Sequence, residues 1–90
     1  MKVRQAKDIC TGIFPDGLVI FSLKTYCAHA LNDSASLIWN FCKKSRAPEE
    51  IARFIGRKYT IDYSLALKDA EKFIGLLGKR GLLEKTMSHE

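Results

Sequence analysis

The chain lacks a hydrophobic run long enough to cross a membrane, and it lacks an N-terminal targeting segment. A membrane-spanning helix needs roughly 18–20 mostly apolar residues, whereas the longest apolar run here, residues 17–21, has the length of a strand. Lys2 and Arg4 are not followed by the apolar stretch of a signal peptide. These absences predict a cytoplasmic protein that does not associate with a membrane.

Cysteines are few and far apart. The three cysteines are Cys10, Cys27 and Cys42, and no two of them form a Cys-x-x-Cys pair. An odd number of widely spaced cysteines, without a histidine at ligand spacing, fits neither a disulfide framework nor a zinc site. We therefore expect reduced and mostly buried thiols, and no bound metal.

The residue clusters that catalysis requires are also missing. His29 is the only histidine ahead of the C-terminal tail, and no neighbouring serine or aspartate suggests a catalytic triad with it. The six glycines are scattered and form no phosphate-binding loop. The sequence therefore predicts a small binding module rather than an enzyme, and it predicts no cofactor.

Positive charge is present without being concentrated. Fifteen Lys and Arg residues against ten Asp and Glu residues give a net charge of +5, but no block of five or six basic residues occurs. A winged-helix nucleic-acid-binding protein is the first alternative. The last predicted helix lacks the polar face, rich in Arg, Asn and Gln, that reads base edges, so nucleic acid is not the partner we expect.

What the chain does contain is a first third rich in strand-forming residues. Residues 9–14 favour a strand, and Pro15-Asp16-Gly17 is a strong turn signal. Residues 18–23 read as a central strand buried on both faces. A third strand is expected over residues 26–31. Short strands joined by tight turns predict an antiparallel meander.

The apolar spacing becomes helical after Asn32. Capping residues at 32–34 precede a first helix, Pro48 and two glutamates favour the start of a second, and a third and longest helix ends at Lys79-Arg80-Gly81. We therefore predict an α+β fold, with a three-stranded antiparallel sheet followed by three helices. One domain is expected over residues 1–90, with an ordered core at about 9–84.

Several segments resemble one protein family. Residues 31–39, Leu-Asn-Asp-Ser-Ala-Ser-Leu-Ile-Trp, are similar to the L-N-x-[ST]-A-x-x-I-W motif of the PqqD family (coenzyme PQQ synthesis protein D). Residues 48–52 resemble the start of that family's second helix, and residues 69–83 resemble its third. One departure is Lys43-Lys44-Ser45-Arg46, which lies where the family frequently carries Asp-Gly.

This resemblance implies a winged-helix-like recognition element for ribosomally made, post-translationally modified peptides. Such a module captures the leader segment of a precursor peptide and presents it to a modifying enzyme, commonly a radical SAM enzyme, in the biosynthesis of PQQ or a related product. In the family the leader adds a strand to the third strand and lies beside the third helix.

The residues themselves favour the same mode of binding. The last strand of a meander can lie at a sheet edge, where unpaired backbone groups accept another strand, and small side chains let it approach. On the third helix, three residues at i, i+4 and i+8 lie off the core stripe. A homodimer that pairs this same edge is the second alternative. The predicted peptide-binding residues are Tyr26, Cys27, Ala28, His29, Ala30, Leu31, Lys68, Lys72 and Leu76.

Overall fold

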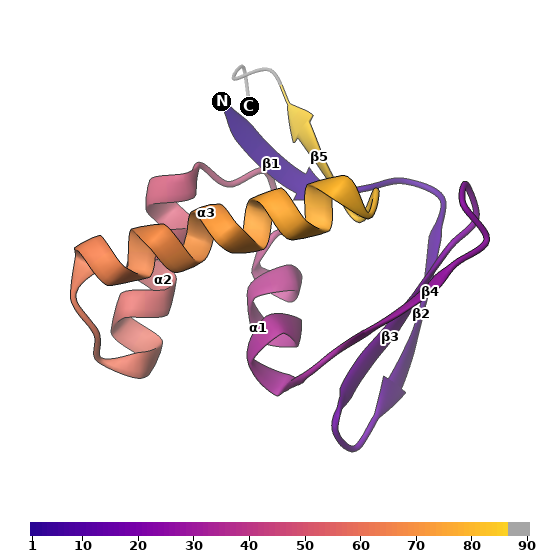
Figure 1. The fold of residues 1–90 in the computed structure, drawn as a ribbon, viewed down its shortest axis with the longest axis horizontal. Coiled ribbons are helices and arrows are strands. Elements are labelled where there is room, and N and C mark those ends of the chain that lie inside the picture. The colour runs from indigo at the N-terminus through magenta and orange to yellow at the C-terminus, as the bar shows by residue number, and fades with distance from the viewer. Residues whose placement is uncertain (87–90) are drawn as a thin grey trace.

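The computed structural model describes residues 1–86, in which two small sheets flank three helices (Figure 1). The last four residues, including His89, lie outside the described part. Among the helices of residues 1–86, none combines the length and the apolar character that crossing a bilayer requires. In chain order the elements are β1 (Lys2–Gln5), β2 (Ile9–Phe14), β3 (Gly17–Ser22), β4 (Ala28–Leu31), α1 (Asp33–Phe41), α2 (Pro48–Tyr59), α3 (Tyr63–Lys79) and β5 (Leu83–Thr86).

The predicted meander is confirmed. Strands β2, β3 and β4 form an antiparallel sheet with β3 at its centre, and the register places Ile20 opposite both Thr11 and His29. Within residues 1–86, β4 pairs only with β3, so its other edge is open. The α+β fold with three helices is likewise as predicted.

A second sheet was not predicted from the sequence. Strand β1 pairs antiparallel with β5, so that Lys2 lies opposite Thr86 and Gln5 opposite Leu83. A further backbone bridge joins Val3 to Arg46, in the loop after α1. Val3 is buried in the core, as are Leu82 and Leu83.

The third strand begins later than predicted. It covers Ala28–Leu31 only, because the preceding residues form a tight turn. In that turn the Ser22 hydroxyl accepts hydrogen bonds from the amides of Lys24 and Thr25, at 3.3 and 3.2 Å. Tyr26 then adopts a left-handed conformation with φ of 57°. The prediction that Tyr26 and Cys27 belong to the strand is therefore wrong.

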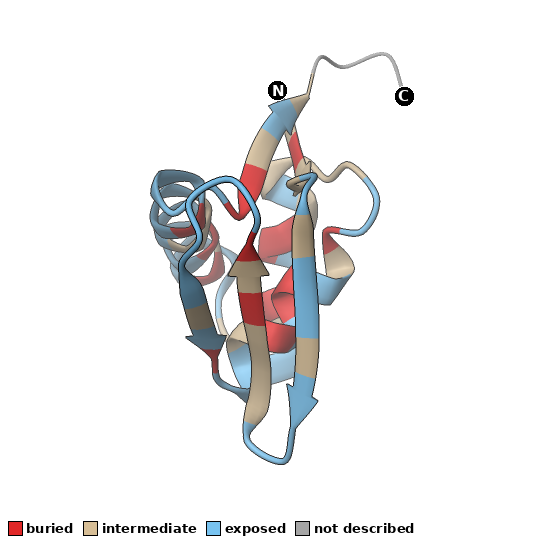
Figure 2. Cartoon of the chain, turned by 90° about the vertical axis from the view of Figure 1, so that its right-hand side faces the viewer, coloured by how far each residue is buried: buried red, intermediate tan, exposed pale blue. Residues whose placement is uncertain are grey.

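The prediction that β3 is buried on both faces is also wrong. Ile20 and Ser22 are buried against the helices, whereas Val19 and Phe21, on the other face, are half-buried. Figure 2 shows this difference as alternating colours along the central strand. Residues two apart share one face of a sheet, so the three-stranded sheet has one covered face and one open face.

The three helices supply most of the core. Asn32 caps α1, because its Oδ1 accepts a hydrogen bond of 2.8 Å from the amide of Ala35. The α2 helix begins at Pro48 as predicted, and the Glu50 side chain accepts a bond from the Ala47 amide. The longest helix, α3, packs chiefly against α2 and β5. The buried helical side chains are Ser36, Ile38, Trp39, Ile51, Ala52, Ile55, Ala66, Ala70 and Leu77.

The cysteines only partly meet expectation. All three are free thiols, but only Cys42 is buried, whereas Cys10 and Cys27 are exposed. Cys10 lies in β2 with its side chain on the open face of the sheet, and Cys27 lies just before β4. The expectation of mostly buried thiols is therefore wrong.

Candidate functional site

The open edge of β4 offers backbone groups to another chain. The amide of Ser22 donates to the carbonyl of Cys27 at 2.9 Å. Hydrogen bonding alternates along an antiparallel pair, so every second residue from Cys27 onward bonds to β3. The N–H and C=O groups of Ala28 and Ala30 therefore point away from β3, towards the open edge. A row of this kind is a template for strand addition.

The side chains of β4 leave this edge accessible. Ala28 and Ala30 are exposed on the open face, and their methyl groups offer little steric hindrance. His29 and Leu31 point to the covered face. Leu31 is only 6% exposed, so its side chain belongs to the core and only its backbone is near the edge.

His29 is the polar side chain on the covered face of this strand. The residue is half-buried, and its Nε2 atom is buried without a hydrogen-bond partner among the described residues. A buried polar atom without a hydrogen-bond partner destabilises the protein, and a ligand group that hydrogen-bonds to that atom removes this penalty. His29 is therefore the one predicted residue on β4 whose side chain can distinguish between ligands by hydrogen bonding.

Tyr26 and Cys27 lie at the start of the edge. Tyr26 is 78% exposed, so its ring is free to contact a chain that continues past Ala28. Both residues lie between the turn at residues 23–25 and the first residue of the strand. They can therefore contribute side-chain contacts, but they do not extend the ladder of outward-facing backbone groups.

The α3 helix runs on the same side of the molecule as the open edge of β4. Figures 1 and 2 agree on this placement, with the helix behind the outermost strand in Figure 2. Lys68, Lys72 and Leu76 are all exposed on α3, and Leu76 is 50% exposed. These three positions lie off the buried stripe of the helix, as predicted.

A hollow between the three helices, beside the N-terminal end of α1, adds residues that were not predicted from the sequence. It has a volume of about 330 Å³. Asp69 of α3 lines it, and Lys72 and Leu76 follow Asp69 at i+3 and i+7 on the same helical face. Lys68 lies one turn before Lys72 on this side of the helix. The lining residues are Ser34, Ile38, Ile55, Tyr59, Ile61 and Asp69.

These lining residues come from three helices and a loop, so no local motif groups them. Asp69 in particular reads as an ordinary solvent-face residue of α3. The signal that could have identified it is its spacing of three and seven residues from Lys72 and Leu76.

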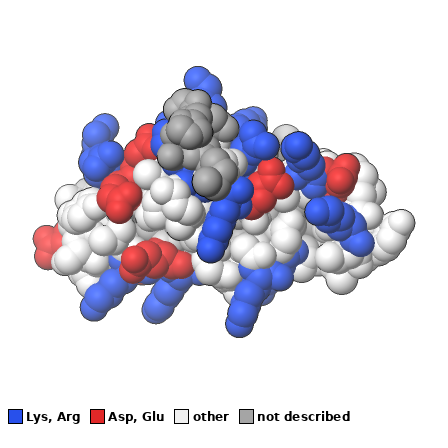
Figure 3. All heavy atoms as spheres, turned by 90° about the horizontal axis from the view of Figure 1, so that it is seen from above, with Lys and Arg blue, Asp and Glu red and all other residues white. Residues whose placement is uncertain are grey.

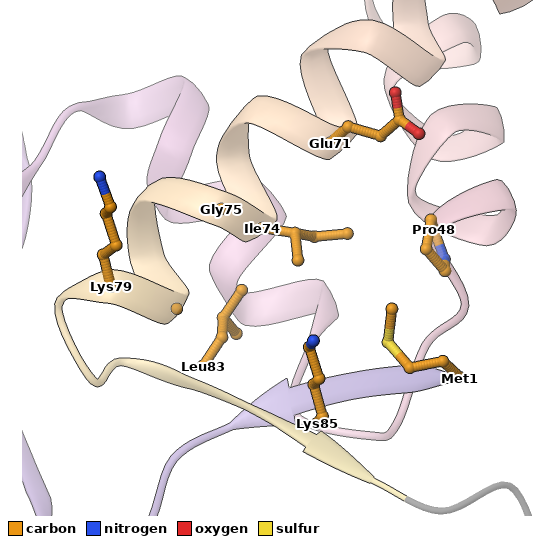
Figure 4. A pocket seen from close by; sticks show the side chains of 9 residues that line it. Met1, Pro48, Glu71, Ile74, Gly75, Lys79, Leu83 and Lys85 are labelled. Carbon is orange, nitrogen blue, oxygen red and sulfur yellow. The ribbon is translucent and has the colours of Figure 1, made fainter.

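A larger hollow lies on another side of α3. It has a volume of about 490 Å³, and Ile74, Leu83 and Met1 point into it (Figure 4). Glu71 and Lys79 lie at its rim. Ile74 lies five residues after Asp69, about 140° around the helix. This hollow therefore does not adjoin the edge of β4.

The sequence places the chain in a family. The model of the PqqD family, coenzyme PQQ synthesis protein D, matches residues 17–83, which is well over half of the chain. The chain belongs to the PqqD family. The resemblance of its motifs is thus confirmed, and the matched region includes β4 and all three helices. None of the curated proteins compared by sequence matches this PqqD-family chain.

Solved structures share the fold over nearly the whole chain. TbiB1 in complex with the TbiA(beta) leader peptide has a TM-score of 0.81 and 25% identity, covering 94% of this chain and 99% of its own. Lasso peptide synthetase B1 complexed with the leader peptide has a TM-score of 0.80 and 21% identity, covering 94% and 100%. The PqqD truncation of Methylobacterium extorquens PqqCD, a stand-alone RiPP recognition element, has a TM-score of 0.74 and 16% identity, covering 93% and 89%.

Proposed function

We propose that this PqqD-family protein binds the leader segment of a ribosomally made precursor peptide as an additional strand along β4. The observation that carries the proposal is the open edge, where the backbone groups of Ala28 and Ala30 face outwards between small side chains. Two of the similar structures contain leader peptides, which supports the same kind of ligand here. The affinity would come mainly from main-chain hydrogen bonds.

Side chains would supply the specificity. A docked strand alternates its side chains between the two faces of the sheet. One set would lie over Ala28 and Ala30 on the open face. The other set would point towards His29 and the α3 face that carries Lys72 and Leu76. This arrangement favours an amphipathic, acidic leader, with a carboxylate near Lys72 and an apolar side chain on Leu76.

The bound leader would then be presented to a peptide-modifying enzyme. The family resemblance implies a radical SAM enzyme as one such partner, in the cytoplasm, for PQQ or a related peptide-derived product. In this role the chain positions the precursor, and the partner carries out the chemistry.

Self-association is a second candidate for the same edge. Two copies of β4 could pair with each other through the outward-facing groups of Ala28 and Ala30, since an uncovered edge invites pairing. A peptide and a second copy would compete for these groups. Light scattering across a range of protein concentrations distinguishes the two occupants. Self-association raises the average molar mass as the protein concentration rises, whereas peptide binding does not.

The test is an NMR titration of the labelled protein with a synthetic leader from a precursor peptide encoded beside its gene. We expect saturable amide shifts in β4 and around Lys72 and Leu76. Ala30→Pro removes an outward-facing N–H without removing a bond to β3, so it should weaken binding at least about tenfold, since each lost hydrogen bond costs roughly 1 kcal/mol and the ring also obstructs the edge.

The matched control is Thr11→Pro on the opposite edge of the same sheet. The amide of Leu23 donates to the carbonyl of Asp8 at 2.8 Å, so the alternation makes the N–H of Thr11 point outwards from β2. This variant should bind the leader as the unaltered protein does. Equal loss in both variants, or shifts confined to β2, would count against strand addition at β4.

A further inference from the structure

A basic groove lies on a different part of the molecule from the edge of β4. It has a volume of about 330 Å³ and is lined by four cationic side chains and one hydroxyl, with no carboxylate among the lining residues. Its loop residues follow the C-terminal end of α1, whereas β4 precedes the N-terminal end of that helix. The lining residues are Lys2, Arg4, Lys43, Lys44 and Ser45.

The groove is built by contacts between distant parts of the chain. Val3 and Arg46 exchange backbone hydrogen bonds of 2.8 and 2.7 Å, which hold the loop against β1. The Thr86 hydroxyl donates to Ser45 Oγ at 3.2 Å. A fixed backbone reduces the conformational entropy that a ligand must remove on binding, so the lysine-bearing loop is organised in advance.

Arg46 fixes the loop without entering the groove. Its Nε donates to the carbonyl of Phe41 at 2.9 Å, and its guanidinium lies 3.9 Å from the centre of the Phe41 ring. Its Nη1 also lies 3.8 Å from Glu50 Oε2. Within the basic segment after α1, Arg46 therefore anchors the loop, whereas Lys43 and Lys44 are exposed to solvent.

The three lysines of the groove have no carboxylate partner within the described part of the chain. Arg4 Nε pairs with Glu84 Oε1 at 3.1 Å, but Lys2, Lys43 and Lys44 form no ion pair within residues 1–86. Three like charges held around one hollow repel one another and attract anions. Leader binding at the edge of β4 does not explain this unpaired positive charge around the groove.

We propose that this groove binds a carboxylate-rich segment of a protein partner. Each lysine ammonium offers three donors, and bonds to carboxylates are charge-assisted. A nucleic-acid site needs a basic stripe that follows several phosphates. Figure 3 instead shows acidic side chains interspersed with basic ones at the end of the molecule where β1 and β5 lie. Because this groove and the β4 edge share no residue, an acidic partner and a leader could bind together.

The test uses a capped peptide of six glutamates, titrated into the labelled protein at low ionic strength. We expect amide shifts in β1 and at residues 43–45, none in β4, and weaker binding as salt is added. Lys43→Glu with Lys44→Glu should reduce the affinity at least about tenfold, because it replaces attraction by repulsion inside the groove. Lys43→Gln with Lys44→Gln should give a smaller loss, and it serves if the reversed pair does not fold.

The matched control is Arg57→Glu with Lys58→Glu on the exposed end of α2, which changes the net charge equally. It should alter the affinity less than about threefold. Equal losses in the two double variants would overturn the proposal, since binding would then follow net charge alone. Tighter binding of duplex DNA in the same groove, or equal shifts with inorganic phosphate at the same anion concentration, would also overturn it.

Discussion

The carbonyl oxygen of Leu31 occupies the position that a side chain on Gly17 would take. Gly17 begins β3 and Leu31 ends β4, so this contact joins the first residue of the central strand to the last residue of the open edge. The φ angle of Gly17 is 139°, in a region that residues with a side chain rarely adopt. Both the steric contact and the backbone conformation therefore require glycine at this position.

Replacing Gly17 should be strongly destabilising. Gly17→Ala adds a methyl group that collides with backbone rather than with a flexible side chain, and it strains the φ angle. We expect a loss of at least about 2 kcal/mol in the free energy of unfolding, measured by urea denaturation. A variant as stable as the unaltered protein would show that β4 can move away from Gly17 at little cost.

Gly75 gives the opposite prediction. It lies inside α3, and a methyl group added there would meet no atom within 4 Å. Gly75→Ala should therefore stabilise the protein by about 1 kcal/mol through helix propensity alone, which raises the melting temperature by roughly 4–8 °C in a domain of this size. An unchanged or lower melting temperature would mean that the hollow beside Gly75 does not tolerate the added methyl group.

Asn32 connects the open edge to the helical core. Its side chain caps α1 directly after β4 ends. Asn32→Ala should cost about 1 kcal/mol of stability, whereas Asn32→Asp should retain most of it, because aspartate accepts the same bond. Thermal unfolding of the two variants measures the difference. Equal losses of stability in the two variants would show that the side-chain amide of Asn32, rather than its capping oxygen, stabilises the protein.

The parts of the fold that were predictable from sequence are those with local signals. The turn at residues 15–17 and the helix starts at Asn32 and Pro48 each depend on residues close to one another in the chain. The β1–β5 sheet has no such signal, because its strands come from opposite ends of the sequence and are four residues long. Pairing of that kind depends on the folded core that brings the ends together.

The site was predictable to the same extent. The small residues Ala28 and Ala30 pointed to an accessible edge, and the structure leaves that edge open. Tyr26 was misread as strand because its side chain favours strands, while the Ser22 hydroxyl stabilises a turn there instead. Asp69 was missed because the hollow that it lines is assembled from separate helices.

Cys42 makes the stability of this protein dependent on pH above 9. Burial raises the pKa of its thiol from the usual 9.0 to about 11, although nearby Arg46 partly offsets this. Between these values the folded protein retains a proton that the unfolded chain has released. The contribution of the protonated thiol to the free energy of unfolding is therefore fully present below pH 9. It is lost as the pH rises, by roughly 2–3 kcal/mol at pH 11.

Comparison with Cys42→Ala isolates this contribution, because every other ionisable group is common to both proteins. Urea unfolding at pH 8 and pH 10.5 should show a steeper loss for the unaltered protein than for the variant.

Maleimide labelling gives an independent check. At pH 8 the folded protein should react at exposed Cys10 and Cys27, and Cys42 should react only after unfolding, since the thiolate is the nucleophile. Parallel pH dependence in the two proteins, together with rapid labelling of Cys42, would mean that the core around α1 opens far more readily than its burial implies.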